Sequence, residues 1–350
     1  MSQLLRANGY WFMRLGRIGG IMRPKVLLKT ALVLALLVGA ALCLVPAGLF
    51  DISGERVWRT FFDPASASRE EALIVWTLRV PRILMALLIG AMLGVAGASM
   101  QSVTRNGLAD PGLIGVTEGA TVVVLAMVVF FPGAAIEWRP VLAMAGSIAV
   151  SALVMVIARN LSSVRFVLIG IGVSWFLTAG ISFFMTTARI TEAQQMLVWL
   201  TGSLGMASWS ALVVALPWFL IGVVLSLLTA RAGDAAQLGP QAARGLGVRV
   251  NALSLTQVAA PVMLTAASVS AVGNLGFVGL IAPHIARFVI GPNQAPLIWG
   301  SAVFGACLVL IGDSVGRLAF APLQIPAGIV MAVLGVPFFL ILLWQRRDAL

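Results

Sequence analysis

Runs of about twenty apolar residues recur along almost the whole chain, and they constrain its fold more than any other feature. A helix needs roughly 20 apolar residues to cross the hydrocarbon core of a bilayer. Ten stretches come close to this length and are predicted membrane spans: residues 26–49, 83–103, 112–131, 140–158, 166–187, 210–230, 252–272, 276–290, 297–318 and 326–345. The alternating pattern of membrane β-strands is absent, so backbone groups have to pair within helices. The predicted fold is therefore an all-α integral membrane protein with about ten transmembrane helices.

The composition agrees with a lipid environment. Hydrophobic residues make up 60% of the chain and charged residues only 10%, and the mean hydropathy is +1.04. A soluble chain of 350 residues needs fewer apolar residues to build its core. The net charge of +11 would suggest nucleic-acid binding in a soluble protein. In a membrane protein this charge is spread over short loops that face anionic headgroups, so we expect membrane lipid, and no nucleic acid, as a partner.

The basic residues between the spans predict how the chain is oriented. Ten crossings place both ends on one side, and fourteen lysines and arginines fall on that side against eight on the other. Because basic residues are enriched in cytoplasmic loops, both termini are predicted to be cytoplasmic. The N-terminal basic stretch lacks a small-residue cleavage site, so residues 1–25 are interpreted as a cytoplasmic basic tail. The short connections between spans make residues 26–350 a single transmembrane domain.

Three glycines share one face of the second predicted span. Gly90, Gly94 and Gly97 are spaced at i, i+4 and i+7, and a missing side chain at these positions lets another helix backbone approach closely. Tight helix packing is the simplest interpretation. The alternative is that the glycine face leaves room for a conduit between helices or subunits.

The motifs of an enzyme are missing from the sequence. No Gly-x-x-x-x-Gly-Lys-Ser/Thr phosphate-binding motif occurs, and the only lysines are Lys25 and Lys29. A single histidine, His284, is too little for a His-based metal site or a catalytic triad. We therefore expect a non-catalytic chain that binds no metal and does not hydrolyse ATP by itself.

The segment 231–251 is the longest predicted cytoplasmic connection between spans. It has an apolar residue at every fourth position, a proline suited to start a helix and two glycines suited to end one: Leu238, Ala242, Leu246, Pro240, Gly245 and Gly247. These features predict a short amphipathic helix on the cytoplasmic face. A merely solvated loop is the alternative.

Several motifs together resemble one family of transporters. They are Arg79-Val-Pro-Arg82, Asn106-Gly-Leu-Ala-Asp-Pro-Gly112, Gly276-Phe-Val-Gly-Leu-Ile-Ala-Pro-His-Ile-Ala-Arg287 and Pro326-Ala-Gly-Ile-Val-Met-Ala-Val-Leu-Gly-Val-Pro337. The chain resembles the permease subunits of ABC importers for ferric siderophores, haem and cobalamin, from about residue 30 to its end. It departs from the family at Gly107, where proline is usual. The resemblance implies a cobalamin-permease-like fold with inverted repeats, in the bacterial cytoplasmic (inner) membrane.

The resemblance also implies partners and a substrate. A second permease subunit, identical or different, would complete a dimer, two ABC ATPase subunits would hold ATP and Mg, and an extracytoplasmic binding protein would deliver the substrate. No cofactor is expected on this chain itself. The expected substrate is a ferric siderophore, with cobalamin or haem as alternatives.

The same resemblance assigns roles to individual residues. Docking of the binding protein is implied for Arg79, Arg82 and Arg317, although arginines at a membrane edge can also simply reach water. ATPase coupling is implied for the segment 231–251, with Asp234, Leu238, Ala242, Arg244, Leu246 and Gly247 as its candidate residues. A cytoplasmic gate is implied at Ser162 and Ser163, for which helix capping is a sufficient local explanation.

Two functions of other classes stay open at this point. An autonomous ion-coupled carrier needs ionisable residues deep in its spans, and the nearest candidates, Glu118 and Asp313, lie near predicted edges. Asp313 precedes Arg317 by four residues, a spacing that favours a local ion pair over a proton relay. A structural scaffold without transport would leave the outer arginines and the cytoplasmic segment unexplained.

Overall fold

The computed structural model describes residues 3–7, 10–15, 18–22, 24–47, 52–63, 67–131, 138–159, 161 and 164–345. Helices make up nearly all of this part of the chain. Their bounds are α1 Pro24–Leu44, α2 Gly54–Phe62, α3 Arg69–Ala72, η2 Leu73–Arg79 (a π-helix), α4 Val80–Thr104, η3 Pro111–Ile114 (a 3₁₀-helix), α5 Val116–Phe130, α6 Arg139–Ala158, α7 Val164–Thr187, α8 Ile190–Leu200, α9 Trp209–Gln237, α10 Pro240–Gly245, α11 Val250–Val272, α12 Val278–Val289, α13 Gln294–Leu318 and α14 Ala327–Gln345.

The number of apolar helices agrees with the prediction of about ten spans. Within the described residues, seven helices are long and apolar enough to cross a membrane, and three shorter apolar helices lie in α1, α5 and α12. Several bounds differ from the prediction, and the helix of the second span already begins at Arg69. Helix α9 continues to Gln237, so the first part of segment 231–251 is helical, and α8 forms where a loop was expected.

The predicted N-terminal tail contains a short sheet. Strands β1 (Gln3–Ala7), β2 (Tyr10–Leu15) and β3 (Ile18–Met22) pair antiparallel in the order β1-β2-β3. The register places Leu5 opposite Phe12, and Phe12 opposite Ile21. These strands were not expected from the sequence.

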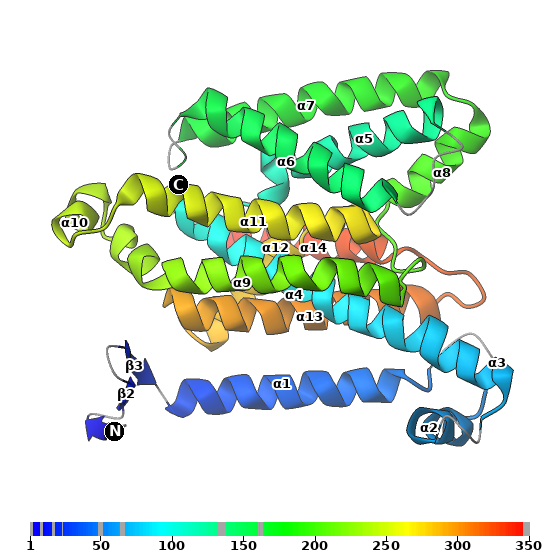
Figure 1. The fold of residues 1–350 in the computed structure, drawn as a ribbon, viewed down its shortest axis with the longest axis horizontal. Coiled ribbons are helices and arrows are strands. Elements are labelled where there is room, and N and C mark those ends of the chain that lie inside the picture. Colours follow the sequence, from blue (N-terminus) through cyan, green and yellow to red (C-terminus); the bar gives the residue numbers. More distant parts are fainter. Residues whose placement is uncertain are drawn as a thin grey trace.

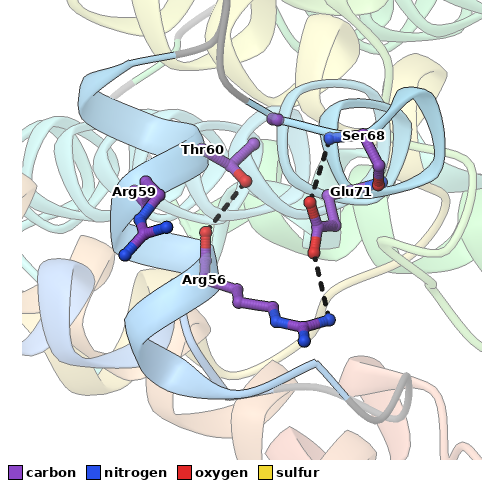
Figure 2. Close-up of a pocket in the computed structure, with 6 residues that line it drawn as sticks. Arg56, Arg59, Thr60, Ser68 and Glu71 are labelled. Carbon is purple, nitrogen blue, oxygen red and sulfur yellow. Dashed lines mark hydrogen bonds and ion pairs between the residues drawn. The ribbon is translucent and has the colours of Figure 1, made fainter.

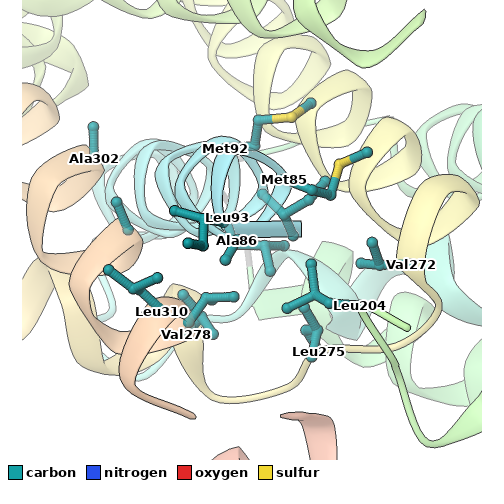
Figure 3. Packing of buried hydrophobic residues seen from close by; sticks show 14 of the residues in the cluster. Met85, Ala86, Met92, Leu93, Leu204, Val272, Leu275, Val278, Ala302 and Leu310 are labelled. Carbon is teal, nitrogen blue, oxygen red and sulfur yellow. The ribbon is translucent and has the colours of Figure 1, made fainter. Parts of the chain in front are cut away.

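Helix α4 lies at the centre of the bundle and packs against α9, α11, α12 and α13 (Figure 1). Its most apolar window is 83% buried, whereas those of α7 and α14 are 22% buried. Figure 3 shows Met85, Met92 and Leu93 of α4 among buried side chains of the surrounding segments. Helices α5 to α8 lie on one side of this core, and α1 lies on the other side, against α13. The sparsely buried faces of α7 and α14 are available to lipid or to another subunit.

The glycine face of α4 explains how the central helices come together. A Cβ atom at Gly90 or Gly94 would overlap the carbonyl group of Gly305 or Ser301, both in α13. At Gly97 it would overlap the backbone of Gly279 in α12. Only hydrogen atoms fit between these backbones, so tight packing is confirmed and the face leaves no conduit inside this chain.

Candidate functional site

The three predicted docking arginines lie at one end of the bundle, which we call the outer rim. Arg79 ends η2, Arg82 lies in the first turn of α4, and Arg317 lies in the last turn of α13. Helices α2 and α3 belong to the same end, and α10 lies at the opposite end together with the labelled ends of the chain (Figure 1). The fold thus brings together three side chains that are far apart in sequence.

Arg82 forms the main ion pair of the outer rim. Its Nη2 and Nε atoms donate to Asp313 at 2.8 and 2.9 Å, and its Nη1 donates to Gln324 Oε1 at 3.0 Å. The side chains of Arg82 and Asp313 are 16% and 6% exposed. The expected local pair between Asp313 and Arg317 is therefore wrong, because the close approach of α4 to α13 offers Asp313 a two-point contact with Arg82.

Arg79 and Arg317 hold the end of α1 instead of facing water. Arg79 Nη1 donates to the carbonyl oxygens of Val45 and Pro46 at 3.1 and 2.6 Å. Arg317 Nη1 donates to Ala47 O at 2.8 Å. The two residues are only 4% and 7% exposed. Carbonyls that follow a helix C-terminus attract cations, so these arginines fasten α1 to the bundle.

A second polar cluster on the outer rim escaped the sequence analysis. Arg56 and Arg59 of α2 border a cavity of about 340 Å³ between α2 and α3, lined also by Thr60, Ser68 and Glu71 (Figure 2). Glu71 lies 3.7 Å from Arg56, and its carboxylate completes a capping box with Ser68 at the start of α3. The only sequence signal was the alternation of charged and aromatic residues over 54–62, which is typical of a helix lying along an interface.

A short helix is present in segment 231–251 as predicted, namely α10, but Leu238 and Leu246 of the predicted apolar stripe lie outside it. It begins at Pro240 and ends at Gly245, and Gly247 has a φ of +81°, where glycine is favoured. Leu238 and Leu246, on either side of α10, are 71% and 66% exposed. Ala242 and Arg244 are exposed as well. The connection around α10 therefore presents exposed apolar side chains at this end of the bundle.

Asp234 contacts another helix of this chain. Its Oδ1 accepts from the backbone N–H of Gln294 at 2.9 Å. Gln294 is the first residue of α13, whose N-cap residue makes no side-chain cap. A carboxylate at this position satisfies a free N–H group and interacts favourably with the helix dipole.

The turn after α4 is held by its own side chains. Asp110 Oδ1 accepts from Gly112 N at 2.7 Å, and Asn106 Oδ1 accepts from Leu108 N at 2.9 Å. Burial raises the pKa of Asp110, and the hydrogen bond from Gly112 opposes this rise. The side-chain bonds keep the turn ordered although Gly107 replaces the proline usual in the family. The predicted gate residues Ser162 and Ser163 lie outside the described residues.

Comparison with known proteins identifies relatives over more than nine tenths of the chain. The permease protein FhuG of an iron(3+)-hydroxamate import system of Bacillus subtilis is 36% identical, over 92% of this chain and 98% of the relative. The hemin transport system permease protein HmuU of Yersinia pestis is 34% identical, over 95% and 99%.

A solved structure, described as an inward-facing conformation of a metal-chelate type ABC transporter, superposes with a TM-score of 0.81. It is 27% identical and covers 92% of this chain and 99% of that chain. The sequence model of the FecCD transport family matches residues 30–345. The chain therefore belongs to the FecCD transport family of ABC importer permeases.

Proposed function

We propose that this chain is the membrane-spanning subunit of a binding-protein-dependent ABC importer that carries a ferric siderophore across the cytoplasmic membrane. A second permease subunit forms a dimer with it, and two partner subunits hydrolyse the ATP. The observation that carries this proposal is full-length similarity to permeases of iron-chelate import systems. Both termini are assigned to the cytoplasm because the basic residues concentrate on their side.

Exposed apolar side chains at the inner end of the bundle support docking of an ATPase partner there. The chain has no phosphate-binding motif, so ATP hydrolysis must come from another subunit. Leu238 and Leu246 flank α10 and offer exposed apolar side chains to a groove in that subunit. We assign docking to this surface, while Ser162 and Ser163 stay the predicted gate.

The outer rim is the proposed docking surface for the binding protein. Of the three arginines there, only Arg82 is not fully buried, and it is the one proposed to meet a carboxylate of the partner. Arg79 and Arg317 are assigned the structural role of holding α1 against the bundle, because their guanidinium groups bind the end of α1. Charge complementarity at such a rim raises the association rate and sets the register of docking.

Haem is the alternative substrate that a specific observation favours, since the hemin permease matches 95% of this chain. Of the two acids considered for an autonomous ion-coupled carrier, Asp313 loses support from the geometry. Such a carrier needs an acid that can exchange protons, whereas Asp313 is bound to Arg82 by three hydrogen bonds.

Purification of the tagged chain from its own host in a gentle detergent tests the importer. We expect an ATPase with a phosphate-binding motif to copurify, and ATP-driven uptake of radio-iron-labelled chelates in proteoliposomes. A panel of ferric hydroxamate, ferric citrate and hemin identifies the substrate class. Uptake that proceeds without the ATPase would contradict the proposal and favour the carrier.

Replacing Leu246 with aspartate is expected to release the ATPase partner. The change puts a charge into the apolar contact, and loss of a central anchor costs about 2 kcal/mol or more in binding free energy. The measurement is the ratio of ATPase to permease recovered on the affinity resin. Leu323→Asp is the matched control, because Leu323 is 74% exposed and follows α13 at the outer rim. Equal loss of ATPase in both variants would contradict the assignment of α10.

A further inference from the structure

The inner end of the bundle contains buried amides and a hydroxyl that no role assigned so far explains. They are bonded to the exposed amide of Gln237 and to the half-buried guanidinium of Arg287. Together these side chains come from four helices and form what we call the inner polar network: Gln101, Ser102, Gln237, Arg287 and Gln294. Gln101, Ser102 and Gln294 are 2%, 6% and 4% exposed. A buried polar group is costly unless it is paired, so a satisfied network favours one arrangement of the helices that carry it.

Ser102, in the last turn of α4, is the centre of the network. Its Oγ accepts from Gln294 Nε2 at 2.7 Å and from Gln237 Nε2 at 3.1 Å. Gln237 Nε2 also lies 3.3 Å from the carbonyl oxygen of Ser102. One serine therefore joins the end of α4 to the end of α9 and to the start of α13.

Gln101, the neighbour of Ser102, adds α12 to the network. Its Oε1 accepts from Arg287 Nη2 at 3.2 Å. Its Nε2 donates toward the carbonyl oxygens of Gly279 and Leu280, at 3.3 and 3.4 Å. This end of α4 is thus hydrogen-bonded to three of the helices packed around it, α9, α12 and α13.

Helix α10 is joined to this network by a very short link. Gln237 is the last residue of α9, and α10 begins at Pro240. The N–H groups of the two linking residues, Leu238 and Gly239, bond back to the last turn of α9. One turn before Gln237, Asp234 caps α13 through the N–H of Gln294. A displacement of α10 therefore acts directly on side chains that bind α4 and α13.

The helices on the other side of the network have to move together. Gly90 and Gly94 place the backbone of α4 in contact with that of α13, and Gly97 places it in contact with α12. Close-packed backbones have low compressibility, so a displacement of one helix is passed on to the helix in contact with it. Helices α4, α12 and α13 are therefore one body, which we call the central body, and the network connects it to α9 and α10.

We infer that the inner polar network is the joint through which a displacement of α10 reaches the central body, with Ser102 and Gln237 as positioning residues for the coupling of ATP hydrolysis to transport. This inference rests on the proposed function. Without the joint, α10 stays on its partner and follows the partner's movement, but α4 no longer follows α10. ATP hydrolysis then continues while uptake falls.

Two substitutions test the joint in the whole transporter, reconstituted in proteoliposomes with its ATPase and binding protein. Ser102→Ala removes an acceptor of two hydrogen bonds, and Gln237→Met keeps the length of the side chain without its amide. Since each lost bond shifts an equilibrium by about fivefold, chelate transported per ATP hydrolysed should fall about tenfold to thirtyfold in Ser102→Ala and about fivefold in Gln237→Met. The ATPase rate should stay close to that of the wild type.

Two further variants separate positioning from loss of structure. Ser102→Thr keeps the hydroxyl and should keep the coupling ratio. Thr104→Val removes a hydroxyl from the same turn of α4, where Oγ1 donates only to Met100 O of its own helix at 2.8 Å. This control should transport like the wild type.

An unchanged coupling ratio in both Ser102→Ala and Gln237→Met would overturn the inference. It would also be overturned if ATP hydrolysis and uptake fell in parallel with thermal stability, because the residues would then serve structure alone. Failure of the wild-type transporter to take up ferric hydroxamate, ferric citrate or hemin with ATP is a different result, which would remove the proposed function and the inference with it.

Discussion

Gly97→Ala is expected to prevent the chain from accumulating in a folded state. A Cβ atom at this position would overlap the backbone of Gly279, and no flexible side chain is present there to move aside. Overpacking costs about 1–3 kcal/mol where neighbours can adjust, and we expect the upper end of that range or more between two backbones. The folded fraction is measured by size-exclusion chromatography of a fluorescent fusion, and the thermal midpoint in detergent.

Gly180→Ala provides the matched control for this experiment. Gly180 lies in α7, and a Cβ atom built there meets no heavy atom within 4 Å. The same methyl group should therefore leave accumulation and thermal midpoint unchanged. If Gly97→Ala behaves like Gly180→Ala, the backbones of α4 and α12 do not approach as closely as the structure has them.

The glycine contacts are a part of the fold that could be predicted from sequence. Apolar runs are set by membrane thickness, and spacing at i, i+4 and i+7 places Gly90, Gly94 and Gly97 on one helical face. Both signals are local. The helices that pack on this face could not be predicted from local sequence, because Gly279 and Gly305 follow about two hundred residues later.

The roles of the outer arginines could not be predicted for the same reason. Arg79 and Arg82 are one helical turn apart, yet one binds the end of α1 and the other binds α13. The spacing of four residues predicted Arg317 as the partner of Asp313. The packing of α4 on α13 instead places Arg82 in contact with Asp313. Helix α8 was missed because its 11 residues are too few to mark a span.

The inner end shows the same division between local and long-range information. Pro240 and Gly245 predicted α10 correctly, since start and stop residues act on their own backbone. Asp234 was interpreted as part of the coupling surface, and its contact with Gln294 of α13 depends on a separation of 60 residues. The inverted repeat implied by the family resemblance stays a prediction.

Removing one partner of the ion pair between Arg82 and Asp313 is expected to be the most damaging single change at the outer rim. Arg82→Leu leaves a carboxylate that is 6% exposed without its partner, which costs about 3–5 kcal/mol of stability. Arg82→Leu combined with Asp313→Leu should recover most of this loss, because no charge is then left buried. Thermal midpoints of the single and double variants measure the difference.

Arg59→Leu is the control for an exposed ion pair. Arg59 binds Glu55 at 3.1 Å on the surface of α2, and the two side chains are 64% and 83% exposed. Exposed pairs contribute about 0–1 kcal/mol, so the thermal midpoint should hardly change. A loss as large as that of Arg82→Leu would mean that removal of any arginine from the outer rim is damaging, whether or not it is buried.

The double variant also separates the structural role of Arg82 from its proposed role in docking. It keeps the net charge of the chain and removes the guanidinium group that a carboxylate of the binding protein would meet. If Arg82 is a docking contact, the stable double variant should associate more slowly with the binding protein, and the difference should shrink as salt is added, since exposed charges are screened over about 10 Å at 0.1 M. Unchanged association in a variant of normal stability would leave Arg82 as a structural residue, and the docking surface would have to lie elsewhere on the outer rim.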